Sequence, residues 1–187
     1  MKPGNIQNIH QDIIDNCRKR ERKAQFQIYR LYYRNMYNIS LRIVNDPDEA
    51  EDIMQEAFLA AFEKIDSYRG EVSFGAWLKR IVINKSLDFI KKKRIELVNL
   101  DEDAGVHGYG DGTEEADSLM EPRLDLIHKC IRMLPDGYRI ILSLYLLEGY
   151  DHQEIAEILG ISASTSRSQY ARARQKLSMM VRKQEHR

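Results

Sequence analysis

The sequence predicts an all-α fold, with two small helical domains joined by an acidic linker and a helix-turn-helix in the C-terminal domain. Apolar residues recur at alternating spacings of three and four, which is the period of one helix face. Proline and glycine are sparse, at 4 and 10 among 187 residues. Four of the glycines and eight acidic residues gather in residues 101–122, a composition typical of a flexible linker. We therefore expect domains over residues 1–100 and 123–187.

The formal net charge of zero conceals three blocks of different sign. Residues 1–100 carry 18 basic and 14 acidic side chains, and residues 123–187 carry 11 basic and 7 acidic ones. Residues 101–122 carry 8 acidic side chains and no Lys or Arg. Because a partner responds to the local field, two mildly basic domains are compatible with nucleic-acid binding despite the neutral total.

Neither cysteine belongs to a recognisable metal or disulfide pattern. Cys17 and Cys130 lie far apart, without a neighbouring Cys or a His at metal-ligand spacing, so we expect buried thiols in a reducing compartment. No metal and no cofactor are expected. The N-terminus lacks the apolar core of a signal peptide, and no run approaches the roughly 20 apolar residues of a membrane span. We expect a cytoplasmic protein without membrane insertion.

Two helices are expected first in the N-terminal domain. One covers about 6–22 and ends in the basic run RKRERK. The other covers about 24–44, and its three-and-four spacing predicts this core stripe: Phe26, Tyr29, Tyr33, Met36, Ser40 and Ile43. Asp46 and Pro47 then end this helix and begin the next, where Glu49 can complete a capping box.

A third helix, about 48–65, has apolar residues on two faces. The face expected to pack inward carries Ala50, Met54, Ala57, Phe58, Ala61 and Ile65. The opposite face carries Asp52, Gln55, Glu56, Leu59, Phe62 and Glu63. Apolar side chains among acids indicate either a binding patch or a helix buried on both sides. Asp52 and Glu56 lie one turn apart, but no nucleophile, metal set or Gly-rich loop accompanies them, so we expect no enzyme active site.

The loop 66–73 leads into a fourth helix, about 74–95, which Ser73 can cap. Its inward stripe is expected to be Phe74, Trp77, Leu78 and Ile81. Its polar surface carries Lys79, Arg80, Asn84, Lys85, Asp88, Lys91, Lys92, Lys93 and Arg94. Tyr68, Phe74 and Trp77 lie beside these cations, a combination that suits single-stranded nucleic acid. For Trp77 we favour the alternative interpretation as a core residue. The run 91–94 can also be explained as a solvated helix end.

Residues 151–177, DHQEIAEILGISASTSRSQYARARQKL, predict two short helices joined by a tight turn. Asp151 and Glu154 can form a capping box, Gly160 permits the left-handed turn, and Ser162 can cap the second helix. The first helix has an apolar face of Ile155, Ile158 and Leu159. The second begins with Ser164, Thr165 and Ser166 and continues with Arg167, Arg172, Arg174 and Lys176. This pattern favours a major-groove reader over a solvated helical hairpin.

Three segments of the chain resemble the extracytoplasmic-function sigma factors of bacterial RNA polymerase. They are NDPDEAEDIMQEAFLAAFEKI at 45–65, FGAWLKRIVINKSLDFIKKKR at 74–94 and LPDGYRIILSLYLLEGYDHQEIAEILGISASTSRSQYARARQKL at 134–177. They occur in the order of that family and cover about three quarters of the chain. The resemblance implies an N-terminal region 2, a linker and a C-terminal region 4, and a protein without chemistry of its own.

The resemblance also implies roles for individual residues. In region 2, the third helix of the family docks on the clamp coiled coil of the largest polymerase subunit, here through Asp52, Gln55, Glu56, Leu59 and Phe62. The loop and fourth helix capture the melted −10 strand, here through Tyr68, Arg69, Lys79, Arg80, Asn84, Asp88 and Lys91. In region 4, the helix-turn-helix reads the −35 duplex and touches the polymerase flap. The DNA-facing positions are Ser164, Thr165, Arg167, Ser168, Gln169, Arg172 and Arg174.

Two positions depart from the family pattern. The family often has a branched apolar residue where this chain has Ser166, and a basic one where it has Gln169. The first bears on packing under the recognition helix and the second on base preference at −35. An anti-sigma factor is a further partner that the family admits but this sequence does not identify.

The alternative function is a stand-alone helix-turn-helix regulator whose N-terminal domain senses a signal or dimerises. The hypothesis of an enzyme fused to a DNA reader is supported only by the acidic pair of the third helix. Purified core polymerase discriminates these three hypotheses, because only a sigma factor needs it for specific DNA binding. On the sigma-factor interpretation, polymerase fixes the spacing of two weak DNA-binding domains and turns them into one avid binder.

Overall fold

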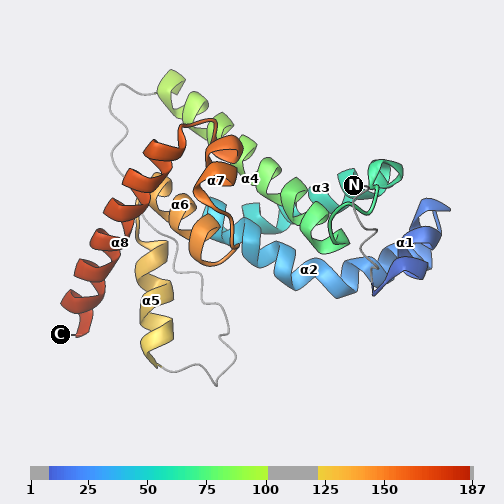
Figure 1. Cartoon of the computed structure of the whole chain (residues 1–187), viewed down its shortest axis with the longest axis horizontal. Coiled ribbons are helices and arrows are strands. Elements are labelled where there is room, and N and C mark those ends of the chain that lie inside the picture. Colours follow the sequence, from blue (N-terminus) through green and yellow to red (C-terminus); the bar gives the residue numbers. More distant parts are fainter. Residues whose placement is uncertain (1–8, 101–121, 186–187) are drawn as a thin grey trace, which may run out of the picture. The chain divides into compact units, whose positions relative to one another are not determined.

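The computed structural model describes residues 9–100 and 122–185, with side chains over 9–93 and 124–185. All regular structure in these ranges is helical, as predicted (Figure 1). The chain divides into two compact units, Met1–Ala104 and Gly105–Arg187. The expected acidic linker lies outside the described residues, apart from its last residue, Pro122, which begins a helix.

The first unit is a bundle in which α2, α3 and α4 pack against one another, while α1 packs against α2 and η1. Its elements are α1 (Gln11–Arg18), α2 (Arg22–Val44), α3 (Pro47–Glu63), the 3₁₀ turn η1 (Ile65–Ser67) and α4 (Phe74–Leu100). Asn45, with a φ of 59°, ends α2 in the left-handed conformation. Asp46 caps α3 as predicted, since its Oδ1 accepts the backbone N–H of Glu49 at 3.2 Å. Pro47 occupies the first position of the helix, where no N–H is needed.

The predicted core stripe of α2 is wrong in its first half. Met36, Ser40 and Ile43 are buried, but Phe26 and Tyr33 are 61 % and 45 % exposed. The buried residues of the first half are instead Ala24 and Ile28. The tyrosine rings of this half lie at the rim, where Tyr29 stacks on Tyr33 with 5.7 Å between ring centroids. The helical period is correct, but the aromatic side chains lie about 100° or more around the helix from the buried face.

The predicted inward face of the third helix is confirmed at all six positions, of which the last, Ile65, lies in η1. Ala50, Met54, Ala57, Phe58, Ala61 and Ile65 are all buried. Small alanines let the neighbouring helices approach closely, while the Phe58 ring packs 5.0 Å from that of Tyr29. Ile53 is also buried and extends the core face. The buried face of α3 fixes which side chains of this helix point outward.

The second unit is built around the long helix α8, which packs against three shorter helices. Its elements are α5 (Pro122–Arg132), α6 (Asp136–Leu146), α7 (His152–Leu159) and α8 (Ala163–Glu185). Ile131, Leu134, Leu142 and Ala173 form a buried cluster against which Leu177 and Met180 of α8 pack. The buried Arg139 completes the base of α6, where its guanidinium pairs with Asp136 at 2.9 Å and donates to the Leu134 carbonyl at 3.2 Å.

The helix-turn-helix forms with the predicted caps. The Asp151 carboxylate accepts the backbone N–H groups of Gln153 and Glu154 at 2.7 and 2.8 Å, and the Glu154 carboxylate accepts the Asp151 N–H at 2.8 Å. Gly160 ends α7 with a φ of 68°. Ser162 caps α8 by accepting the Thr165 N–H at 3.0 Å. The end of α7 and the start of α8 are therefore defined by contacts local to the motif.

Candidate nucleic-acid and protein interfaces

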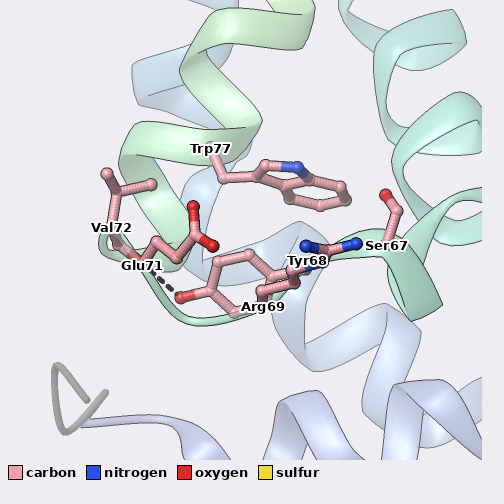
Figure 2. Close-up of a pocket in the computed structure, with 6 residues that line it drawn as sticks. All are labelled: Ser67, Tyr68, Arg69, Glu71, Val72 and Trp77. Carbon is pink, nitrogen blue, oxygen red and sulfur yellow. Dashed lines mark hydrogen bonds between the residues drawn. The ribbon is translucent and has the colours of Figure 1, made fainter. Parts of the chain in front are cut away.

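An open pocket lies at the junction of η1, the following loop and α4. It is lined by Ser67, Tyr68, Arg69, Glu71, Val72 and Trp77, with a volume of about 390 Å³. Figure 2 shows the Trp77 indole above the Tyr68 ring, with the Arg69 guanidinium beside them and with Glu71 and Ser67 toward the two ends of the pocket. The pocket offers aromatic carbon, a guanidinium and a carboxylate within one small site. These groups match the faces and edges of a nucleobase.

The Tyr68 ring is buried under the loop and is not free to receive a base in this conformation. It is 3 % exposed, and its hydroxyl donates to the Val72 carbonyl at 2.7 Å, drawn as the dashed line in Figure 2. In this conformation the Tyr68 ring supports the pocket from below, and direct contact of Tyr68 with DNA stays a prediction. Trp77 is half-buried, with its centroid 5.3 Å from that of Tyr68 and 5.4 Å from that of Phe74. It is thus both part of the core and part of the pocket wall.

Helix α4 presents a polar face next to this pocket. Arg80, Asn84, Asp88 and Lys91 follow one another at spacings of three and four, and so share one face. Lys79 precedes Arg80 by one residue and points about 100° away, so it does not join that face. Asp88 and Lys91 form a weak ion pair at 4.0 Å. The loop residue Arg69 is exposed and contributes a cation at the pocket itself.

The outer face of α3 is exposed in the first unit, so the helix is not buried on both sides. Leu59 is 64 % exposed, and its neighbours on this face, Asp52, Gln55 and Glu56, are exposed as well. Phe62 is half-buried, with its ring 6.0 Å from that of Phe58. Among the two interpretations of this face, the exposure of Leu59 favours a binding patch with an apolar centre and an acidic rim.

The predicted DNA-facing residues of α8 divide by exposure. Ser164, Arg167, Ser168, Arg172 and Arg174 are exposed, whereas Thr165 and Gln169 are half-buried. Arg167 and Arg172 are five residues apart and therefore lie on either side of the outward face. The exposed set gives this helix short polar residues at its start and cations along both flanks. That arrangement fits a helix lying between base edges and two phosphate backbones.

The packing under α8 at Ser166 is polar. Ser166 is fully buried, and its Oγ lies 3.0 Å from Nδ1 of His152 on α7. The His152 ring in turn stacks on Tyr145 with centroids 4.6 Å apart and meets the edge of Tyr170. This hydrogen bond joins the two helices of the motif at a position where the family often has a branched apolar residue. The sequence marks Ser166 as a serine at a core position, but it does not reveal that His152 is its hydrogen-bond partner.

Two arginines outside the predicted site reach the pocket loop from the N-terminal side. Arg18, the last residue of α1, donates from Nη2 to the Tyr68 carbonyl at 2.7 Å. Arg20 donates to the Phe62 carbonyl and pairs with Asp66 at 3.4 Å. Sequence reasoning treated this stretch only as the basic end of a weak helix. A contact across 50 residues leaves no local pattern that could have revealed it.

Both cysteines are buried free thiols, as predicted. Burial, aided by the charge of Glu21, raises the pKa of the Cys17 thiol to about 11. Burial likewise raises the pKa of Cys130.

Across the described residues, no group of three His, Cys, Asp or Glu side chains is placed to hold a metal ion. Within the same ranges, no helix has the length and apolar content needed to cross a membrane.

Two family models match the chain. Residues 28–95 match Sigma-70 region 2, and residues 124–177 match Sigma-70, region 4. The first match covers α2 from Ile28, α3, the pocket loop and α4 as far as Ile95. The second spans α5, α6, α7 and the DNA-facing part of α8. Helix α1 lies outside both matches.

Characterised proteins of similar length align with almost the whole chain. The chain is 32 % identical to the ECF RNA polymerase sigma factor SigW of Bacillus subtilis over 90 % of its own length and 95 % of that protein. It is 27 % identical to the RNA polymerase sigma-H factor of Pseudomonas aeruginosa over 90 % and 92 %. In fold it is similar to the sigma factor RpoE of Bartonella quintana, solved in complex with the anti-sigma factor NepR. That similarity has a TM-score of 0.58, 23 % identity and coverage of 83 % and 95 %.

Proposed function

The chain belongs to the extracytoplasmic-function sigma factors of RNA polymerase, and we propose that its two units divide promoter recognition between them. The observation that carries this proposal is the presence of region 2 and region 4 in one chain, in that order. The protein is a regulatory subunit that directs core polymerase to specific promoters. It acts by binding, in the cytoplasm, where polymerase and promoter DNA are found.

The first unit captures the melted −10 strand. A base that leaves the stack enters the pocket lined by Trp77 and the 66–73 loop, while the flanking phosphates follow Arg69 and the face of Arg80, Asn84 and Lys91. Supporting this role, the pocket holds an aromatic wall, a cation and a carboxylate in one place. Trapping an unpaired base lowers the free energy of the open duplex, so melting needs no hydrolysis.

The second unit reads the −35 duplex through α8. The exposed arginines flank a polar strip, so phosphate contacts fix the register while Ser164, Ser168 and one arginine reach base edges. Each domain alone binds DNA weakly. Polymerase, by holding both, raises the effective concentration of the second domain at its element once the first is bound.

Core polymerase docks on the outer face of α3. Leu59 is the apolar anchor, and Asp52, Gln55 and Glu56 form a polar rim that suits a basic partner surface. An exposed leucine at the centre of an acidic face supports this choice over other faces of the unit. The RpoE structure similar to this fold was solved with the anti-sigma factor NepR, and an anti-sigma factor for this chain would compete for the same exposed surfaces.

Run-off transcription with purified core polymerase tests the proposal. A sigma factor yields transcripts from selected promoters only when core and protein are both present. A stand-alone regulator would instead shift the same duplex DNA without core polymerase. Specific duplex binding that is equally tight without core, and no promoter-dependent transcript with it, would contradict the proposed function.

A further inference from the structure

Helix α1 supplies an oriented arginine to the backbone of the pocket loop. Arg18 donates from Nη1 to Asp15 at 2.8 Å and from Nη2 to the Tyr68 carbonyl at 2.7 Å. Asp15 also accepts a hydrogen bond from Gln11 at 2.9 Å. The Asp15 carboxylate therefore orients the planar guanidinium of Arg18 toward the loop. A charged donor at 2.7 Å makes one of the stronger hydrogen bonds available to a carbonyl.

The carbonyl that Arg18 holds belongs to the residue that organises the pocket. The Tyr68 hydroxyl closes the loop onto Val72, and its ring packs against Phe74 and Trp77. Between these two anchors the chain turns through Gly70, whose φ of 75° suits glycine. The Tyr68 hydroxyl holds the loop, and the Tyr68 carbonyl is held by Arg18 of α1. A shift of α1 therefore moves the pocket wall.

The turn after α1 is anchored to the same region by a second arginine. Arg20 adopts a φ of 63°, a left-handed conformation that is uncommon for a residue with a Cβ. Its guanidinium reaches the C-terminal carbonyls of α3 at Phe62 and Glu63, and the carboxylate of Asp66. Cations are favourable at a helix C-terminus, where the last carbonyls lack partners. The strained turn therefore has a compensating contact at the start of the pocket segment.

We propose that Arg18 is a positioning residue for base capture, acting through the Tyr68 carbonyl, and that α1 is a brace for the promoter-melting loop. This inference rests on the proposed function but assigns a role to a helix outside both family matches. Arg18 does not touch DNA in this scheme. Its loss relaxes the loop, so the trapped base meets a pocket that is no longer preorganised.

The test uses holoenzyme reconstituted with core polymerase and a promoter that the wild-type holoenzyme selects from randomised duplex DNA. Two probes are compared by fluorescence anisotropy. One is a duplex that carries the −35 element and ends upstream of −10, and the other is a forked DNA with the −10 non-template strand unpaired. Arg18→Met removes the donors and keeps much of the side-chain length. Arg22→Met is the matched control, since Arg22 is an exposed cation at the start of α2.

Arg18→Met is expected to bind the forked probe about tenfold more weakly, corresponding to ~1.4 kcal/mol, with unchanged affinity for the duplex probe and for core. Arg22→Met matches wild type on both probes. Arg18→Lys keeps a cationic donor group but loses the guanidinium fork, and it recovers part of the loss. Wild-type affinity of Arg18→Met for the forked probe overturns the inference. So does an equal loss on both probes with a lower thermal midpoint, which marks a merely structural role. If the wild-type holoenzyme selects no promoter, that result contradicts the proposed function and not the role of Arg18, and it is known before any variant is compared.

Discussion

Replacing Leu59 tests whether the outer face of α3 is the docking surface for core polymerase. Full burial of a leucine side chain contributes about 1.5–3 kcal/mol. Because Leu59 is 64 % exposed in the free protein, burying the rest of it on docking contributes about 1–2 kcal/mol of binding free energy. Leu59→Ala is therefore expected to weaken core binding roughly 5- to 30-fold. Leu59→Arg adds the cost of burying a charge and is expected to weaken it about 100-fold or more.

The fold should be indifferent to both changes. Leu59 lies on the face of α3 opposite the buried alanines, so its loss creates no cavity, and surface substitutions of this kind usually change stability by less than about 0.5 kcal/mol. Leu31→Arg is the matched control. Leu31 is 49 % exposed on α2 and lies about 160° around that helix from Tyr29, which packs on the α3 side.

The assay is competition for fluorescent core polymerase, with thermal unfolding measured on the same preparations. Normal core binding by Leu59→Arg would refute the docking surface. Loss of the thermal transition would refute the placement of Leu59 outside the core. Equal weakening by the Leu31 control would show that any cation on this unit disturbs the complex, and would leave Leu59 without a specific role.

Three further outcomes are expected. Of Arg167→Ala and Arg172→Ala, selection on randomised −35 DNA should show one variant that relaxes preference at a single position, at a cost of about 1–3 kcal/mol, and one that weakens all sequences alike. Ser166→Ala leaves Nδ1 of His152 without its partner and should lower the free energy of unfolding in urea by about 1 kcal/mol. Because burial raises the pKa of Cys17 from 9.0 to about 11, the unfolded chain loses the thiol proton first. Stability should therefore fall as the pH rises through that window, and less steeply in Cys17→Ala.

The sequence predicted helices well wherever local chemistry decides them. The caps at Asp46, Asp151 and Ser162 are hydrogen bonds within three residues, so a short window contains both partners. The buried face of α3 was also predictable, because its alanines leave only one side that can approach another helix closely. Fold class and the positions of the turns follow from such local signals.

The first half of α2 was not predictable in the same way. It carries two apolar stripes, one with Ala24 and Ile28 and one with Phe26 and Tyr33, and hydrophobicity favours the larger rings. Which stripe is buried depends on what α1 and α3 present to it, which a single helix does not encode. A tyrosine at the rim of the core, with its hydroxyl in water, costs little free energy. The sequence therefore gives no sign that these rings are exposed.

The candidate site shows the same division between local and distant causes. Trp77 and the cations of α4 were identifiable from composition alone. The burial of Tyr68 and its link to Arg18 were not, because they depend on contacts with helices distant in the sequence. Likewise, Ser166 marked an unusual core position, but only the fold brought His152 to it.

The ion pair between Glu56 and Lys85 gives the first unit a thermodynamic link between two faces. Glu56 lies on the outer face of α3, and its carboxylate is 2.9 Å from the ammonium of Lys85 on α4. A basic partner that takes Glu56 releases Lys85, and a phosphate that takes Lys85 releases Glu56. Each event removes a cost from the other, so the two affinities must rise together by the same factor. For a pair this exposed the exchange is worth less than about 1 kcal/mol, and it requires no movement of the backbone.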